Sequence, residues 1–366
     1  MNRLLLSWPL MAACAGEERE DTNGQASLST LGGSNSDSAP DTDSPDDDTG
    51  ELKLDVGPAG SGGQAGGCGK VDFLFVIDNS FSMAEYQNRL VTSFPGFVDA
   101  IRTALGQAQD YNIMVIDTDP AGPVDCASIC PVAVGSNCVT NNTCTPYNPD
   151  IPLCTTTCLD FLECSSLPGG CGAPPPPETC DIMGAGINFP RGSDATNAAC
   201  SFTSGLRYID STETDLDSAF DCAARVGTNA RGSAELPIGS MLSALDEATP
   251  AGACNGGFLR DDAILVITVI SDEDDAAANG TPGLAPDWVA DLVAAKNGDP
   301  SAVVVLGLLG NEDEDCGEDS PRLREFVDLW GGQGRIGSIC SPSYVPFFEE
   351  VVGLIDDTCD DFVPPG

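Results

Sequence analysis

The sequence has no histidine among its 366 residues. Histidine is the usual general base at neutral pH, the usual partner of nucleophilic serine and cysteine, and a common ligand of catalytic zinc. Carboxylates alone can support some enzymes, but most positioned acid–base groups are missing here. We therefore expect a protein that is not an enzyme.

Basic residues are also scarce. Lys and Arg total 15 against 57 Asp and Glu, which gives a formal charge of −42. Such a surface repels nucleic acid and anionic lipid headgroups, so we expect no nucleic-acid partner. It attracts cations, and its carboxylates are the oxygen ligands that calcium and magnesium prefer.

Long apolar runs are missing beyond the N-terminus, and none of the remaining runs is long enough to span a membrane. Residues 1–3 end in a positive charge, residues 4–10 are apolar, and Met11-Ala12-Ala13-Cys14 follows. Small residues before a cysteine resemble a lipobox, so we interpret 1–14 as a signal peptide with Cys14 as the lipidated residue. This predicts an exported protein on the bacterial cell envelope that contacts the membrane only through its lipid. The alternative is an ordinary export signal that is cut near Ala13.

Cysteine, by contrast, is abundant, with seventeen residues. They do not form regular CxxC pairs, and no histidine is present to complete zinc sites. The pattern indicates disulfides and an oxidising compartment. Without Cys14, sixteen cysteines remain, an even number that can pair completely.

Residues 15–67 are rich in Asp, Ser, Thr, Gly and Pro, as in Asp41–Asp48. Such a segment buries too little apolar surface to offset its ordering entropy, so we expect a disordered acidic tether. A calcium-binding role for Asp41–Asp48 is the alternative.

Order is expected from Cys68 onward. Short apolar runs predict strands that are buried on both faces, at 71–77, 111–116, 263–270 and 302–309. Helical periodicity is present around Trp288–Ala295, at Phe347–Ile355 and at Tyr86–Ile101, where Pro95-Gly96 is expected to kink or split the helix. Alternating strands and helices predict a doubly wound, mainly parallel α/β sheet.

Residues 120–203 interrupt this alternation. They hold ten cysteines and a dense run of prolines at 174–177. A loop of this length is unusual inside a compact domain. We interpret it as a disulfide-stapled insertion with little core of its own.

The first predicted strand ends in Asp78-Asn79-Ser80-Phe81-Ser82. In open α/β sheets, ligands bind at the carboxyl ends of the strands. Oxygen side chains at i, i+2 and i+4 in a strand-to-helix turn are able to converge on one small, hard cation. The pattern therefore predicts a metal site.

Residues 71–83, VDFLFVIDNSFSM, resemble the first strand and metal-ion-dependent adhesion site of von Willebrand factor A (vWA) domains. The family pattern Asp-x-Ser-x-Ser is matched by Asp78, Ser80 and Ser82, with Phe81 where glycine is common. Residues 264–272 resemble the family's fourth buried strand and its closing aspartate, here Asp272. Glu273–Asp275 follow in place of glycine. They are either a second cation site or, as we expect for at least two of them, a solvated acidic loop.

The family's third element is a threonine before a helix. In the matching stretch, Gly232–Gly239, the threonine position holds Leu236, which has no ligand atom. Glu235 and Ser233 are the nearest oxygen donors. Glu235 as a substitute ligand is a hypothesis.

The resemblance covers about 68–119 and 204–361, which predicts one vWA domain over 68–361, with the insertion inside it and a tail at 362–366.

The resemblance also implies a metal-dependent, adhesion-type protein-binding module. Mg, Mn or Ca would be held by Ser80, Ser82 and Asp272, Asp78 would organise the site, and an unknown partner protein would offer a carboxylate to the metal. The insertion would either form part of the surface that contacts the partner or only shield the domain. The resemblance also implies that Cys68 pairs with Cys359, because the first and last elements of the family lie close together. The alternatives are a structural envelope protein with calcium used only for stability, and an intracellular subunit of a chelatase-type ATPase, against which the signal peptide and cysteines argue.

Overall fold

The structure is a computed structural model. It describes residues 69–104, 110–120, 136–140, 143–146, 178–192, 194–228, 235–248, 253–275, 280–311, 314 and 316–365. The signal segment, the tether and Cys68 lie outside these residues, so the predictions made for them stay predictions. No helix in the described ranges is long and apolar enough to cross a membrane.

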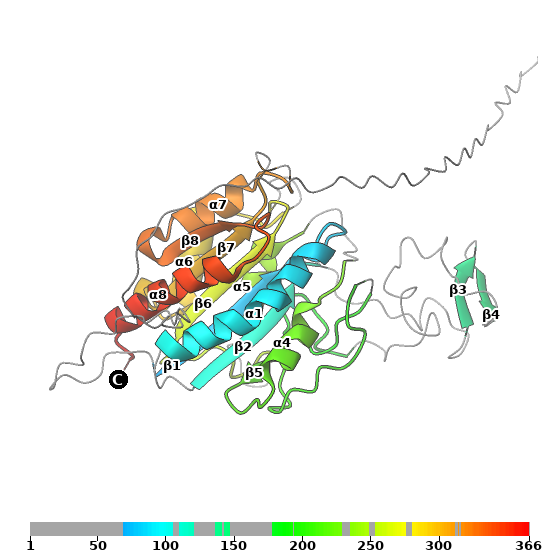
Figure 1. The fold of residues 1–366 in the computed structure, drawn as a ribbon, viewed down its shortest axis with the longest axis horizontal. Helices are drawn as coiled ribbons and strands as arrows, with labels where there is room; N and C mark the ends of the chain where they lie inside the picture. The colour runs from blue at the N-terminus through cyan, green and yellow to red at the C-terminus, as the bar shows by residue number, and fades with distance from the viewer. Residues whose placement is uncertain are drawn as a thin grey trace, which may run out of the picture. The chain divides into compact units, whose positions relative to one another are not determined.

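Six strands form one sheet in the order β5-β2-β1-β6-β7-β8 (Figure 1). The strands are β1 (Lys70–Ile77), β2 (Asp110–Asp117), β5 (Ile209–Asp210), β6 (Ile264–Ser271), β7 (Val303–Leu309) and β8 (Gly334–Ser338). All neighbours are parallel except the short edge strand β5, which is antiparallel to β2. The four apolar runs are the four central strands, and the prediction of a doubly wound α/β sheet is confirmed.

Helices cover both faces of the sheet. They are α1 (Ala84–Ala104), α4 (Leu216–Ala224), α5 (Pro237–Ala248), α6 (Ala285–Ala295), α7 (Pro321–Asp328) and α8 (Val345–Asp361), with short 3-10 turns at Pro300–Ala302 and Gly331–Gln333. One buried cluster joins the sheet to α1, α4 and α8, which Figure 1 shows in front of it. The other joins the opposite face to α5, α6 and α7.

Strand β1 supplies both of these cores. Phe73 and Phe75 pack toward α1, whereas Leu74 and Val76 pack toward α5. Alternate side chains of a strand point to opposite faces, so a central strand covered on both sides must be apolar at nearly every position. This explains why the run from 71 to 77 is almost wholly apolar.

Helix α1 continues through Pro95, so the expected split at Pro95-Gly96 does not occur. Proline removes one backbone hydrogen bond from a helix. Phe94 and Phe97 on either side are buried, and the Phe94 ring stacks on Phe220 of α4 with 3.5 Å between centroids. Burial of these rings offsets the lost hydrogen bond. The helices predicted around Trp288 and Phe348 are α6 and α8.

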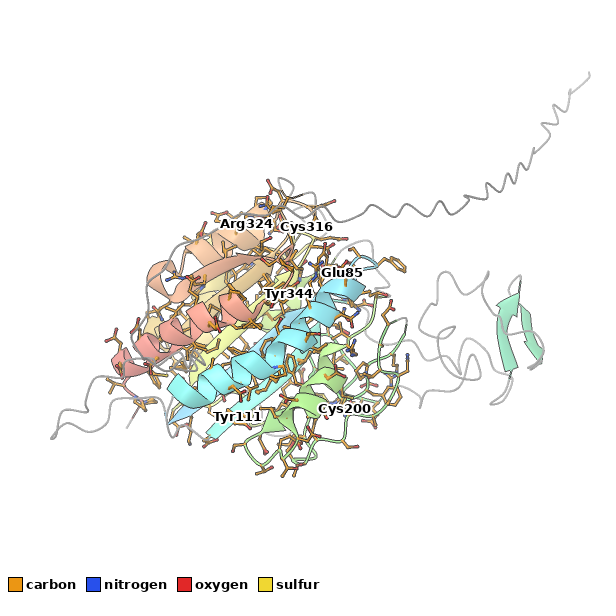
Figure 2. The ribbon with its side chains drawn as sticks, viewed as in Figure 1. Glu85, Tyr111, Cys200, Cys316, Arg324 and Tyr344 are labelled. Atoms are coloured by element: carbon orange, nitrogen blue, oxygen red, sulfur yellow. A yellow bond between two sulfur atoms is a disulfide. The ribbon has the colours of Figure 1, made fainter. Side chains whose placement is uncertain are left out.

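Three disulfides join described residues: Cys180–Cys254, Cys200–Cys222 and Cys316–Cys340. Cys180 and Cys200, which the sequence assigns to the insertion, are thus bonded to the α/β domain, and Cys200 lies beside α4 (Figure 2). Cys359 is also disulfide-bonded. Because Cys68 lies outside the described residues, its pairing with Cys359 stays a prediction.

Between 121 and 177, the structure describes only an antiparallel strand pair, β3 (Ser136–Thr140) and β4 (Thr143–Pro146). From 178 onward the chain runs along the domain, and the backbone N–H of Ile187 donates to the carbonyl of Val115 in β2 at 2.9 Å. This segment forms one wall of the cavity described below.

Candidate metal centre at the carboxyl edge of the sheet

Asp78 is the first residue after β1 and is fully buried. Its backbone N–H donates to the carbonyl of Ile270, which continues the pairing of β1 with β6 by one residue. Its side chain accepts two hydrogen bonds, from the backbone N–H of Ser80 at 2.7 Å and from the hydroxyl of Ser271 at 2.6 Å. Asp78 therefore ties the first loop to the end of the neighbouring strand.

Ser80, Ser82 and Asp272 come together at this edge, although 192 positions separate Ser80 from Asp272. The Ser80 and Ser82 hydroxyl oxygens are 3.1 Å apart, and the Ser80 hydroxyl lies 3.5 Å from Oδ1 of Asp272. Ser82 is exposed, whereas Asp272 is buried. The three groups form a cluster of oxygen atoms that is open to solvent on one side.

The backbone of Asp272 is enclosed by the loop after β7. Its carbonyl accepts from the N–H of Glu318 at 2.7 Å. A side-chain carbon added at Gly310 or Gly317 would lie within 2.8 Å of that carbonyl oxygen. Glycine is needed here because any Cβ would collide with the aspartate loop, and Gly317 also has a positive φ of 73°.

Glu235 lies in the third loop, just before α5, and is only 4% exposed. Its carboxylate accepts a hydrogen bond from the hydroxyl of Thr118, which also lies 3.5 Å from the side-chain oxygen of Asn79. The backbone N–H of Leu236 donates to the carbonyl of Thr118. Leu236 has no ligand atom, and its neighbour Glu235 is the residue of this loop whose carboxylate interacts electrostatically with Asp78. Ser233 lies outside the described residues.

The expectation that at least two of Glu273–Asp275 form a solvated acidic loop is wrong, because the carboxylates of Asp274 and Asp275 both bind backbone N–H groups. The Asp275 carboxylate is fully buried and accepts from the backbone N–H groups of Ile238 and Thr281. Asp274 accepts from the backbone N–H groups at the start of α7. Carboxylates stabilise helix N-termini because several N–H groups there lack partners within the helix. These two aspartates therefore hold helices in place.

Three carboxyl groups at this edge titrate abnormally. Burial raises the pKa of Asp78 to about 7 and that of Glu235 to about 9. Burial also raises the pKa of Asp272. Among the described residues, no Lys or Arg forms a salt bridge with any of the three. The cluster thus has a shortage of positive charge, and its hydroxyl and carboxylate oxygens suit a hard divalent cation.

Another group of candidate metal ligands, Glu314, Cys316 and Cys340, is unsuitable for a metal. The two sulfurs are bonded to each other, and metal binding at cysteine requires a thiolate.

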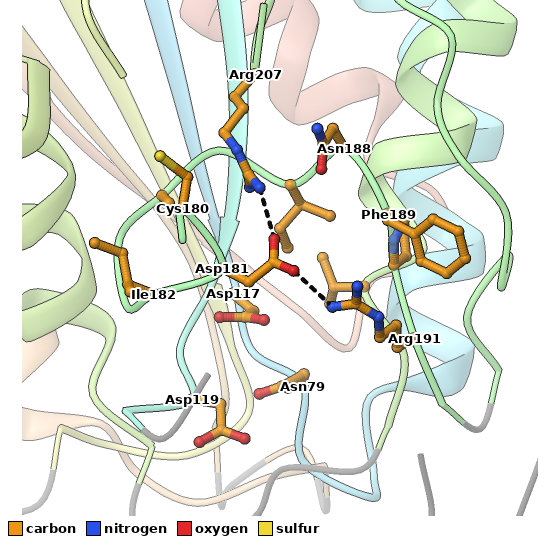
Figure 3. A pocket seen from close by; sticks show the side chains of 14 residues that line it. Asn79, Asp117, Asp119, Cys180, Asp181, Ile182, Asn188, Phe189, Arg191 and Arg207 are labelled. Carbon is orange, nitrogen blue, oxygen red and sulfur yellow. Dashed lines mark hydrogen bonds and ion pairs between the residues drawn. The ribbon is translucent and has the colours of Figure 1, made fainter. Parts of the chain in front are cut away.

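A cavity adjoins the candidate metal centre (Figure 3). On one side it is lined by Asn79, Asp117 and Asp119 from the ends of β1 and β2. On the other side Asp181 lies between Arg191 and Arg207, at 3.1 Å and 2.6 Å. Neither this cluster nor the contacts of Thr118 and Ser271 follow from any local pattern in the sequence. The one available signal was the position of Ser271, which directly precedes the candidate ligand Asp272.

No family model matches the chain, and no curated protein matches it. Among solved structures, it is similar to proximal thread matrix protein 1 from the mussel byssus, with a TM-score of 0.34 and 11% sequence identity. The similarity covers 80% of this chain and 48% of that chain, so this chain spans about half the length of that protein. A likeness of this size establishes neither a common family nor a common function.

Proposed function

We propose that this domain is a cation-dependent protein-binding module of the vWA type. One observation supports this most directly: Ser80, Ser82 and Asp272, which the resemblance assigns to one site, meet within 3.5 Å at the carboxyl edge of the sheet. Their oxygen atoms suit Mg, Mn or Ca. The vWA assignment itself rests on the Asp-x-Ser-x-Ser pattern and on the confirmed α/β fold.

In this proposal Ser80, Ser82 and Asp272 hold the cation, and Asp78 orients the first loop through its bond to the Ser80 N–H. Glu235 is the additional ligand in place of threonine. The bound cation supplies a positive centre with an open position for a carboxylate of the partner protein. Phe81, which is 67% exposed in the same loop, offers an aromatic contact beside it.

Calorimetric titration of the oxidised chain with magnesium, manganese and calcium tests the site. We expect saturable one-to-one binding that is lost in Asp78→Ala and retained in Asp299→Ala. Asp299 is a suitable control because it also accepts a serine hydroxyl at 2.6 Å, but at the start of β7 and so at the opposite edge of the sheet. Equal binding by the wild type and Asp78→Ala would refute the proposed site. Glu235→Ala with unchanged affinity would remove Glu235 from the ligand set.

A structural envelope protein is the second candidate, favoured by the raised pKa values of Asp78 and Glu235. Buried carboxylates of this kind destabilise the cation-free domain at neutral pH, so a cation used only for stability would also explain the cluster. A cation that raises the melting temperature but leaves partner binding unchanged would support this candidate.

We also propose that the chain is displayed on the bacterial envelope through a lipid on Cys14. The support is the sequence pattern of residues 1–14. Expression in a bacterial host with labelled fatty acid should give labelled, membrane-associated protein for the wild type. Cys14→Ser should give unlabelled protein that leaves the membrane fraction. Equal labelling of the two would refute lipidation at Cys14.

A further inference from the structure

Arg191 is an unusual arginine in this acidic chain. Its side chain is only 5% exposed, and its Nη1 atom lies 3.1 Å from Oδ2 of Asp181. Its guanidinium also lies over the ring of Phe189, 5.0 Å from the centroid. Asp181 in turn accepts from Arg207 and from the backbone N–H of Glu178. Arg191 is thus held rigidly in the wall of the cavity.

One edge of this guanidinium is unused. Among the described residues, the buried Nε has no hydrogen-bond partner, and Nη1 makes the only polar contact of the side chain. Arginine binds carboxylates in two-point fashion through adjacent N–H groups. A buried donor without an acceptor is costly, so an acceptor is expected to reach this edge.

The disulfide Cys180–Cys254 fixes the backbone directly beside Asp181 to the loop before β6. Arg207 is held too, because its Nη1 donates to the carbonyl of Gly186 at 2.9 Å. Both arginines therefore keep their positions without a ligand. Preorganised groups of this kind lose little entropy on binding.

The cavity and the candidate metal centre share a wall. Asn79, which lines the cavity, stands between Asp78 and Ser80 in the first loop. Asp117 and Asp119 line the cavity as well and oppose an anionic ligand. A divalent cation at the neighbouring centre offsets that repulsion. Arg191 and Arg207, two of only fifteen basic residues, are the positive groups of this cavity.

We infer that Arg191 forms a second subsite, which binds a carboxylate of the same partner protein whose first carboxylate binds the cation. The partner then carries two acidic side chains, one for each subsite. This inference rests on the proposed cation-dependent function. It explains how an acidic domain selects an acidic partner: only two correctly spaced carboxylates meet the cation and the arginine together.

The test uses the oxidised full chain saturated with magnesium, with acetate and the straight-chain dicarboxylates from malonate to adipate as probes. We expect at least one dicarboxylate to bind about 10- to 100-fold more tightly than acetate, the gain typical of a hydrogen-bonded charged contact. Arg191→Gln should abolish this gain without changing magnesium affinity. Arg191→Lys keeps the positive charge but lacks the two adjacent N–H donors of a guanidinium, so it should retain only part of the gain in dicarboxylate affinity. Arg335→Gln, which breaks an exposed ion pair with Glu350, is the matched control.

Equal dicarboxylate binding by the wild type and Arg191→Gln would overturn the inference and leave the cation site standing. If the wild type binds no magnesium, the proposed function fails instead. The subsite is then tested directly by the NMR signal of the Arg191 Nε–H group, assigned by its loss in Arg191→Lys. A saturable shift of this signal with acetate supports the subsite, and an unmoved signal refutes it. The same measurement decides the question if Arg191→Gln does not fold.

Discussion

The hydroxyl of Ser271 donates a 2.6 Å hydrogen bond to Oδ2 of Asp78, and so joins the ends of β6 and β1 at the centre of the sheet. The parallel register explains the contact. Ile77 is aligned with Ile270 in the pairing of β1 with β6. The residues that follow them, Asp78 and Ser271, therefore lie opposite each other just beyond the last aligned pair. The bond also lowers the pKa of Asp78 and opposes the effect of burial.

Ser271→Ala is expected to destabilise the domain by about 1–3 kcal/mol, because it leaves a buried acceptor without its donor. The pKa of Asp78 should rise further, so the carboxyl group must lose a proton before a cation binds. Magnesium affinity should therefore fall at pH 7, with a smaller deficit at pH 8.5. Calorimetry at the two pH values measures this. Ser301→Ala, which removes a 2.6 Å bond to Asp299 at the opposite edge of the sheet, should leave magnesium affinity unchanged. Equal effects of the two variants on affinity would contradict the prediction.

The stability of the cation-free domain should fall as pH rises. The pKa of Glu235 is about 9 in the folded chain, against an ordinary value of 4.5. The folded state therefore binds this proton more tightly than the unfolded state does. The resulting stability is fully present below about pH 4.5 and is lost as pH rises through 9. Urea denaturation in the presence of a chelator at pH 5.5, 7 and 9 measures the slope.

Glu235→Gln should flatten that slope, because the amide does not titrate. At pH 9 the variant should be at least about 1 kcal/mol more stable than the wild type, roughly 2–4 °C in melting temperature. Glu350→Gln is the control, since this exposed residue forms an ion pair with Arg335 at the surface. A slope in Glu235→Gln as steep as in the wild type would show that another group carries the pH dependence.

Two adjacent aspartates should differ strongly in their effect on stability. Asp275 is buried and accepts from Ile238 and twice from Thr281, and it also forms an ion pair with Arg322 at 3.4 Å. Asp275→Ala leaves the N–H groups of Ile238 and Thr281 and the Thr281 hydroxyl without this acceptor, although Arg322 keeps its bonds to backbone carbonyls. The loss of three buried hydrogen bonds should cost about 3–5 kcal/mol. Asp274→Ala removes the capping bonds at the start of α7 and should cost about 1 kcal/mol. Urea denaturation of both variants decides this, and comparable losses would contradict it.

The two disulfides that attach residues 178–200 should contribute unequally. Cys180–Cys254 closes a loop with a sequence separation of 74, and Cys200–Cys222 one with a separation of 22. The chain-entropy model assigns them about 4 and about 3 kcal/mol. Paired serine substitutions at each bridge, compared by urea denaturation, test the order. A greater loss for the Cys200–Cys222 pair would show that native contacts, rather than loop length, set the difference.

Much of the fold was predictable from local sequence. The four apolar runs identified the four central strands because a strand covered on both faces needs apolar side chains on both. The edge strands β5 and β8 were missed, since Ile209–Asp210 is only two residues long and Gly334–Ser338 is rich in glycine and polar residues. The sequence left a kink or a split of this helix at Pro95 open. The structure rules out the split, because burial of Phe94 and Phe97, rather than local propensity, decides that α1 continues.

The candidate site, too, was predictable from the sequence only in part. The sequence by itself determined that Asp78, Ser80 and Ser82 lie in one loop, because spacing alone places them at the end of a strand. Only the tertiary structure decided that Thr118 contacts Glu235, 117 positions away, and that Asp274 and Asp275 hold helices. It also placed Asp181 between Arg191 and Arg207. Such contacts depend on strand register and on the path of long loops, which bring together side chains that no local pattern relates.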